Sequence, residues 1–177
     1  MLEKDRHSVC DEGYRITSLY LDDINQTSYY EKLSGDMNRK KYRLRAYNLN
    51  SSFISLECKE KIQNKIDKTS VRIDKNIFDG IVKNDYEPLY EKKDSLSKNV
   101  IALNREKLLS PVVVVDYVRE AYIHPLSNTR ITFDKELSVG INTFDFFEDG
   151  YKIANVFDKN EVILEVKYDD YLPAFIS

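Results

Sequence analysis

Short alternating segments dominate the pattern of apolar and polar positions along this chain. Successive side chains of a β-strand point to opposite faces, so an apolar residue at every second position predicts a half-buried strand. This alternation predicts seven strands, with a further extended segment at 139–147. The seven strands are expected at residues 14–21, 41–47, 53–62, 65–74, 111–123, 130–137 and 162–168. Most connections between them are short, which favours antiparallel pairing.

Three segments have helical spacing instead. Residues 27–33 predict a short helix, and Asp74 is a suitable N-cap for a second short helix. The apolar stripe of that helix consists of Ile77, Phe78, Ile81 and Val82. Residues 95–108 predict the third helix, with apolar positions every three or four residues. The expected fold is therefore α+β, with one domain over residues 1–177 in which helices pack outside an antiparallel sheet.

The polar face of several predicted strands carries charges at adjacent positions. Side chains at i and i+2 point the same way and lie about 7 Å apart, so Arg43 and Arg45 share a face, as do Lys59 and Lys61. Similar rows occur on the other strands. They contain Glu57 beside the two lysines, then Lys68, Ser70 and Arg72, then Arg130, Thr132, Asp134 and Glu136, and finally Glu165 and Lys167.

Two structures are compatible with such rows. For any one strand, a solvated outer face is the simpler interpretation, because antiparallel sheets often have one wet side. Like charges so close together are unfavourable, however, unless water or an anion neutralises them. Repetition over five strands therefore favours a closed or nearly closed β-barrel, a tunnel with a charged interior that holds a polyanion.

Composition narrows the class of ligand. The chain has 177 residues, of which 32% are charged, yet its formal net charge is only −3. Non-specific nucleic-acid binding normally requires a basic excess, so we expect no nucleic-acid partner. Its five glycines form no phosphate-binding glycine loop, so a phosphate ligand would have to be held by side-chain cations.

The remaining chemistry-bearing residues have structural explanations. Cys10 and Cys58 are expected to be free thiols in a reducing compartment, and no apolar run approaches a membrane span, which together predict a cytoplasmic domain. Cys58 is expected in the core. His7 and His124 are far apart in sequence, and no Ser-His-Asp or Cys-His arrangement is visible. The run at 112–115 is expected to be a strand segment buried on both faces.

The sequence resembles a known family in six segments that occur in the expected order. They are residues 14–22, 41–47, 56–61 with Lys68, 111–122, 130–134 and 163–168. In these segments it is similar to the VTC-type polyphosphate polymerase domain, a branch of the triphosphate tunnel metalloenzymes that also include the CYTH enzymes. The resemblance implies an antiparallel tunnel with helices outside it.

The resemblance also implies a site. The residues matching those that hold the triphosphate are Arg43, Arg45, Lys59, Lys68, Arg119 and Arg130, and Glu165 matches the glutamate that holds Mn²⁺ or Mg²⁺. Four other residues, Glu57, Lys61, Glu136 and Lys167, are candidates only because they share strand faces with these. Phosphoryl transfer suits such a set, since it depends on positioning and charge neutralisation more than on covalent chemistry.

Three functions remain open at this point. The resemblance implies transfer of the γ-phosphate of ATP onto a polyphosphate chain. An inorganic triphosphatase would use the same tunnel, and a non-catalytic module could bind polyphosphate alone. The family usually has a strand and helix before the segment at 14–22 and a closing helix after residue 177. We therefore expect an open edge, capped by a partner chain or a second copy.

Overall fold

The computed structural model describes residues 2–5, 13–63, 65–158, 160–169, 171–172 and 174. Within these residues nine strands form one antiparallel sheet, which confirms the α+β class. The strands are β1 (Glu3–Lys4), β2 (Tyr14–Asp22), β3 (Arg39–Tyr47), β4 (Ile54–Ile62), β5 (Lys65–Ile73), β6 (Ser110–His124), β7 (Thr129–Gly140), β8 (Ile153–Asn155) and β9 (Val162–Lys167). Their main order is β5-β4-β3-β2-β6-β7-β8, with β1 paired to β6 and β9 paired to β7.

The three predicted helices are present. They are α1 (Thr27–Leu33), α2 (Lys75–Val82) and α3 (Ser95–Lys107), with 3₁₀ turns η1 (Glu87–Glu91) and η2 (Leu126–Asn128) between longer elements. Asp74 caps α2 as expected, because its carboxylate accepts a hydrogen bond from the Ile77 N–H at 2.9 Å. The N-terminal N–H groups of Ser28 and Tyr29 in α1 donate to Asp22, the last residue of β2.

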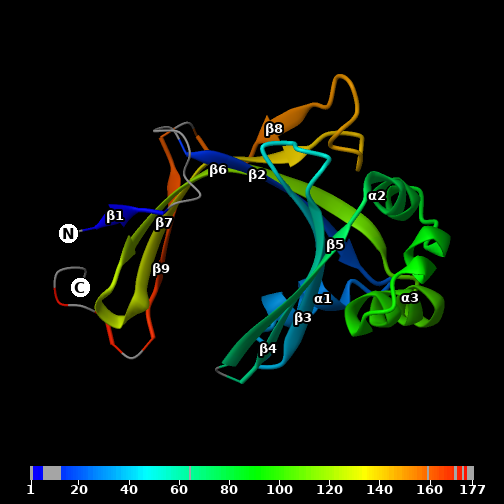
Figure 1. Ribbon diagram of the computed structural model, residues 1–177, viewed down its shortest axis with the longest axis horizontal. Coiled ribbons are helices and arrows are strands. Elements are labelled where there is room, and N and C mark those ends of the chain that lie inside the picture. Colours follow the sequence, from blue (N-terminus) through cyan, green and yellow to red (C-terminus); the bar gives the residue numbers. More distant parts are fainter. Residues whose placement is uncertain are drawn as a thin grey trace.

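The sheet is strongly curved, and Figure 1 shows it as an arch with α2 and α3 outside the wall formed by β3, β4 and β5. The main hydrophobic core lies between these helices and the convex face of the sheet. It includes Leu44 and Leu56 from the strands and Phe78 and Val100 from the helices, all fully buried. This packing buries the apolar face and leaves the polar face of the same strands on the concave side.

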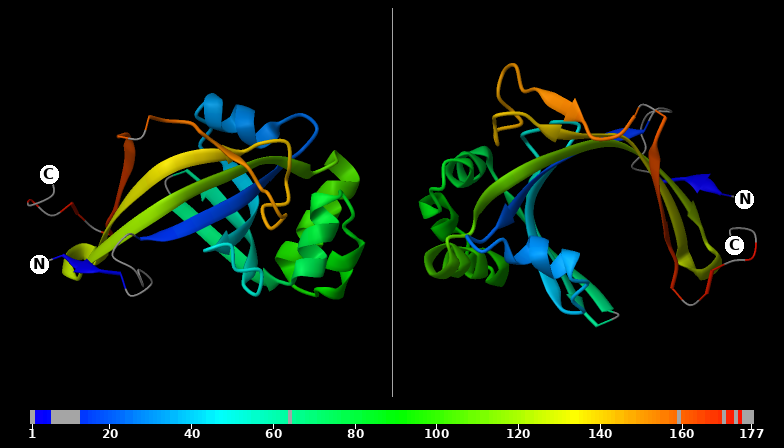
Figure 2. Two further views of the ribbon diagram at one scale, coloured as in Figure 1. Left: turned by 90° about the horizontal axis from the view of Figure 1, so that it is seen from above. Right: turned by 180° about the vertical axis from the view of Figure 1, so that it is seen from behind.

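The described strands form an open arch and not a closed barrel, which agrees with the open edge expected from the sequence. In the part of the chain that the structure describes, β5 has a neighbour only in β4, and β9 has one only in β7. The right-hand view of Figure 2 shows the resulting opening between the β5 and β9 ends of the arch. An open edge was expected from the sequence, but the short strand β1, which pairs Glu3 with Ile123, was not.

Three local predictions were wrong or incomplete. The segment 139–147 is extended only as far as Gly140 and then turns, which places Phe146 in the core. Strand β8 was not predicted. The valine run is not buried on both faces, because a register shift between β2 and β6 leaves Val112 without an opposite residue and exposed.

Candidate functional site

Glu57 is the centre of a cationic cluster on the β3–β5 wall of the concave face. Its carboxylate lies 2.7 Å from Arg43 Nη2, 2.7 Å from Lys68 Nζ and 4.0 Å from Arg45 Nη1. The register explains this arrangement, since Arg43 lies opposite Glu57 and Glu57 opposite Ser70, next to Lys68 on the same face. Burial alone would raise the pKa of Glu57, but the hydrogen bond from Lys68 and the charge of Arg43 hold it below its usual value.

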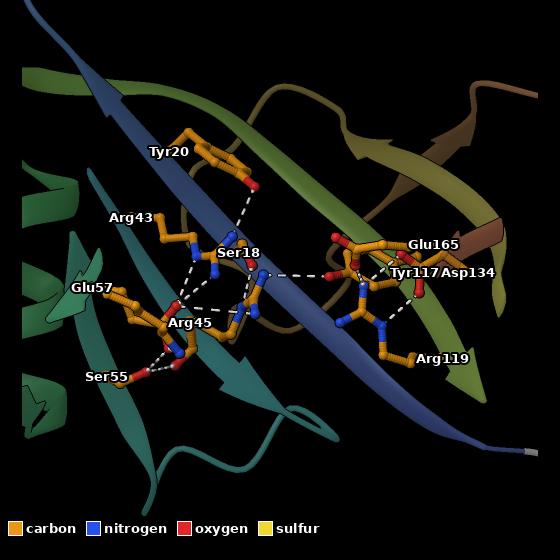
Figure 3. Close-up of polar contacts among 11 residues, drawn as sticks. Ser18, Tyr20, Arg43, Arg45, Ser55, Glu57, Tyr117, Arg119, Asp134 and Glu165 are labelled. Atoms are coloured by element: carbon orange, nitrogen blue, oxygen red, sulfur yellow. Dashed lines mark hydrogen bonds and ion pairs between the residues drawn. The ribbon is translucent and has the colours of Figure 1, made fainter. Parts of the chain in front are cut away.

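Arg45 connects this wall to the rest of the arch. Its Nε donates to the Ser18 hydroxyl at 3.0 Å, and its Nη2 donates to the Tyr117 hydroxyl at 3.3 Å. Arg43 makes a comparable contact, donating to the Tyr20 hydroxyl at 3.2 Å. Figure 3 shows both guanidinium groups directed along the concave face from β3 toward side chains of β2 and β6.

The second wall is built around Arg119 on β6. Its guanidinium forms a bidentate pair with Asp134 of β7, with two N···O distances of 2.6 Å, and lies 3.9 Å from a carboxylate oxygen of Glu165 on β9. Glu165 is also 3.6 Å from Lys167 Nζ. The structure thus brings Arg119 of β6 close to Glu165, which shares one face of β9 with Lys167.

Two polar atoms near this wall have no hydrogen-bond partner among the residues that the structure describes. Arg130 donates to the Tyr14 hydroxyl at 3.4 Å and pairs with Asp5 at 2.8 Å, but its Nε is buried without a hydrogen-bond partner. The hydroxyl of Thr132, two residues along the same face, is also buried and unpartnered. Buried polar groups are rarely left unsatisfied, so these atoms indicate a site for water or an oxygen-rich ligand.

The two walls approach each other across the concave face. Burial lowers the pKa of Lys59 on β4, and the positive charge of Lys167 on β9 lowers it further, while Glu165 acts in the opposite direction. Strands β4 and β9 are not neighbours in the sheet, so these charges interact through the concavity. An anion placed between the walls would lie near cations from both.

Two second-rank candidates do not join this group. Lys61 lies at the end of β4 and lines a pocket with Arg39 and Lys107, beside α1. Glu136 was expected to share a face with Arg130, but it adopts a φ of 54° where β7 carries one more residue than β6. This bulge breaks the alternation, so Glu136 does not continue the row.

Several residues that contact the cations were missed from the sequence. Ser18, Tyr20 and Tyr117 hydrogen-bond the paired arginines, and Tyr14 hydrogen-bonds Arg130. Their sequence signals were alternation, which places Tyr14, Ser18 and Tyr20 on one face of β2, and a position inside the segments 14–22 and 111–122 that resemble the VTC-type domain. Cys58, by contrast, lies in the core as expected. His7 falls outside the described residues.

Together these features define a class of fold, an arched antiparallel sheet with cations from both walls on its concave face. The family model of the VTC domain matches residues 2–177, so the chain belongs to the VTC family, which is associated with polyphosphate synthesis. No curated protein matches the chain. Among the described residues, no helix is long and apolar enough to cross a membrane.

A solved structure of the PH1819 protein from Pyrococcus horikoshii OT3 is similar at 15% identity, with a TM-score of 0.37. The similarity covers 77% of this chain and 59% of that one, so the chain spans less than two thirds of that protein. This similarity is too distant to bear on function.

The VTC and tunnel-enzyme families generally use divalent metals. Among the described residues, no three His, Cys, Asp or Glu side chains are grouped as a protein-built cage. Mg²⁺ is often held by one or two carboxylates together with substrate phosphates. Glu165 fits that role, because it lies between Arg119 and Lys167, where phosphate oxygens would be attracted.

Proposed function

We propose that this domain is a phosphotransferase that moves the γ-phosphoryl group of ATP onto the end of a polyphosphate chain, using a divalent metal. The observation that supports this most is the placement of cations on both walls of one concave face. Arg43, Arg45, Lys59 and Lys68 come from β3 to β5, and Arg119, Arg130 and Lys167 come from β6, β7 and β9. A chain of phosphates offers a negative charge at every unit to such a surface.

The proposed reaction requires little from the protein beyond position and charge. A terminal oxygen of the polyphosphate attacks the γ-phosphorus, the bond from that phosphorus to the β,γ-bridging oxygen breaks, and its electron pair leaves with ADP. The attacking oxygen is already anionic, so no general base has to remove a proton. Charge spreads over the equatorial oxygens of the transferred group in a loose transition state, which fixed cations stabilise.

The carboxylates among these cations hold them in place. Glu57 orients Arg43 and Lys68. Asp134 accepts hydrogen bonds from Nε and Nη2 of Arg119 and so holds that guanidinium group in a fixed orientation. Guanidinium forks match phosphate oxygens bidentately, and lysines provide point charges. Glu165 would hold the metal, which would supply positive charge to offset the negative charge that develops during transfer.

The triphosphatase remains the alternative, because water could attack the same phosphorus in the same site. Ser18 and Tyr20 lie in a segment that resembles the VTC-type domain, and they contact Arg45 and Arg43. The resemblance at residues 18–20 and 42–45, together with the family match over residues 2–177, favours the polymerase. A module that only binds polyphosphate would need the cations without Glu165.

The test is incubation with γ-labelled ATP and Mn²⁺ or Mg²⁺, followed by separation of polymer, free phosphate and ADP. Label in polymer with equimolar ADP supports the proposal. Label released only as phosphate shows a hydrolase, and intact ATP with tight polyphosphate binding shows a binding module. Lys135→Ala is the matched control, because this lysine pairs with Glu120 on the convex side, away from the cationic face.

A further inference from the structure

A pocket of about 720 Å³ opens at one end of the cationic face. It lies between β2, the start of β6 and helix α1, and Figure 2 shows α1 beside the ends of β2 and β3. Its lining is mainly apolar and aromatic, with Tyr20, Tyr29, Phe144, Val113 and Val115 among its walls. The volume falls within the usual range of small-molecule sites, about 300–1,000 Å³.

The lining is accessible and unlike the rest of the concave face. Tyr29 is 57% exposed and Phe144 is 38% exposed, although both are large apolar side chains. The bulge at Val112 and the turn after Gly140 create this surface, because β7 ends there and no longer covers the start of β6. Aromatic rings left in contact with solvent beside a charged site favour a flat apolar ligand.

The pocket is continuous with the arginine pair through Tyr20. The Tyr20 ring lines the pocket, while its hydroxyl accepts a hydrogen bond from Arg43 Nη1 at 3.2 Å. Lys41 also lines the pocket and shares a strand face with Arg43 and Arg45. Alternate residues of a strand are about 7 Å apart, so these three cations form a row that leads from the pocket into the cationic face.

We infer that this pocket binds the purine base of a nucleoside triphosphate, with its phosphates extending along Lys41, Arg43 and Arg45. The inference rests on the proposed function and adds a base site to it. Stacking on aromatic side chains is worth about 1–3 kcal/mol per base, because every base has a flat π-face, and a larger ring system stacks more strongly. The class of ligand follows from a flat apolar site joined directly to a row of cations.

The pocket has few groups that could read the edge of a base. Asp22 is the main carboxylate in its wall, and its oxygens already accept hydrogen bonds from the N–H groups of Asp23, Ser28 and Tyr29. Recognition by stacking without such readout predicts that ATP and GTP bind about equally. Pyrimidine nucleotides should bind less tightly because their smaller rings stack less.

The experiment compares equilibrium binding of ATP and of inorganic tripolyphosphate by calorimetry. Phe144→Ala and Tyr29→Ala should each weaken ATP binding about fivefold or more, and leave tripolyphosphate binding within about twofold. Tyr90→Ala is the control, because this partly exposed tyrosine stacks with Arg105 on the helical side. It should change neither affinity.

The outcomes separate the two proposals. The base site is refuted, and the phosphate site stands, if wild-type protein binds tripolyphosphate but binds ATP no more tightly than tripolyphosphate. The same conclusion follows if both pocket variants leave ATP affinity unchanged. Equal weakening of both ligands would also refute the base site. If neither ligand binds, the proposed function fails, and the base site fails with it.

Discussion

Replacing Glu57 by glutamine should have opposite effects on two properties of the protein. It should lower the stability of the fold and raise the affinity for polyanions. The carboxylate is 3% exposed and contacts Arg43, Lys68 and, through its Oε1, the Ser55 hydroxyl at 3.3 Å. Glutamine keeps the shape but removes the negative charge, and its NH₂ group would face cations. The variant therefore leaves like charges close together without their shared counter-ion.

The size of the effect follows from burial. Removing one partner of a buried ion pair typically costs about 3–5 kcal/mol. Here the Lys68 side chain is 47% exposed and can regain water, so we expect roughly 2–3 kcal/mol after discounting for solvent screening. At about 2–4 °C per kcal/mol, the melting temperature should fall by about 5–10 °C. Polyanion affinity should rise several-fold, because phosphates no longer compete with Glu57.

Thermal unfolding with and without tripolyphosphate measures both effects. Glu60→Gln is the matched control, since it lies on the same strand but pairs with Lys40 on the other face. The folded pKa of Glu57 lies below its ordinary value of 4.5, so its contribution is fully present above that value and is lost as pH falls through the folded pKa. Equal melting shifts for the two variants, or weaker binding by Glu57→Gln, would refute the reasoning.

The other predictions concern the cations and Glu165, the proposed metal ligand. Arg45→Ala should weaken tripolyphosphate binding by about 1.5–3 kcal/mol in calorimetry, while Lys135→Ala should have no measurable effect. Glu165→Gln should keep the fold and anion binding but lose metal-dependent turnover, and full activity would assign the metal to another carboxylate. Burial and the charge of Lys167 hold the pKa of Lys59 below 10.5. As pH rises, Lys59 should therefore lose its positive charge, and the protein its anion affinity, at a lower pH than with an ordinary lysine. A pH titration of binding checks this, and Lys59→Arg should move the loss to higher pH.

Local signals account for most of the elements that the sequence predicted. The helix at 27–33 has the bounds expected, and Asp74 caps α2, because caps and apolar spacing act within a few residues. The β8 strand and the burial of Phe146 depend on packing against distant elements. The bulge at Glu136 was also invisible, since it arises from the register between β6 and β7.

The site was predictable only in part, for a similar reason. Alternation placed Arg43 and Arg45 on one face, and the structure confirms that they share the concave side. It could not predict that Arg45 reaches Tyr117, 72 residues away, or that Arg119 pairs with Asp134. Those contacts depend on which strands are neighbours, and strand order is not encoded in the period of any single strand.

Charge balance on the concave face explains how a chain with a net charge of −3 can suit a polyanion. Glu57 and Asp134 each hold a guanidinium group at 2.7 Å or less, so the cations are already paired before any phosphate arrives. Under the proposed function, binding is an exchange of acceptors, in which phosphate oxygens take over hydrogen bonds that these carboxylates now accept. The binding free energy at each cation is the difference between its contacts with phosphate and its contacts with the carboxylate. A ligand with several linked phosphates gains this free energy at several cations at once. A single phosphate gains it only once, so this face should favour chains of phosphates over orthophosphate.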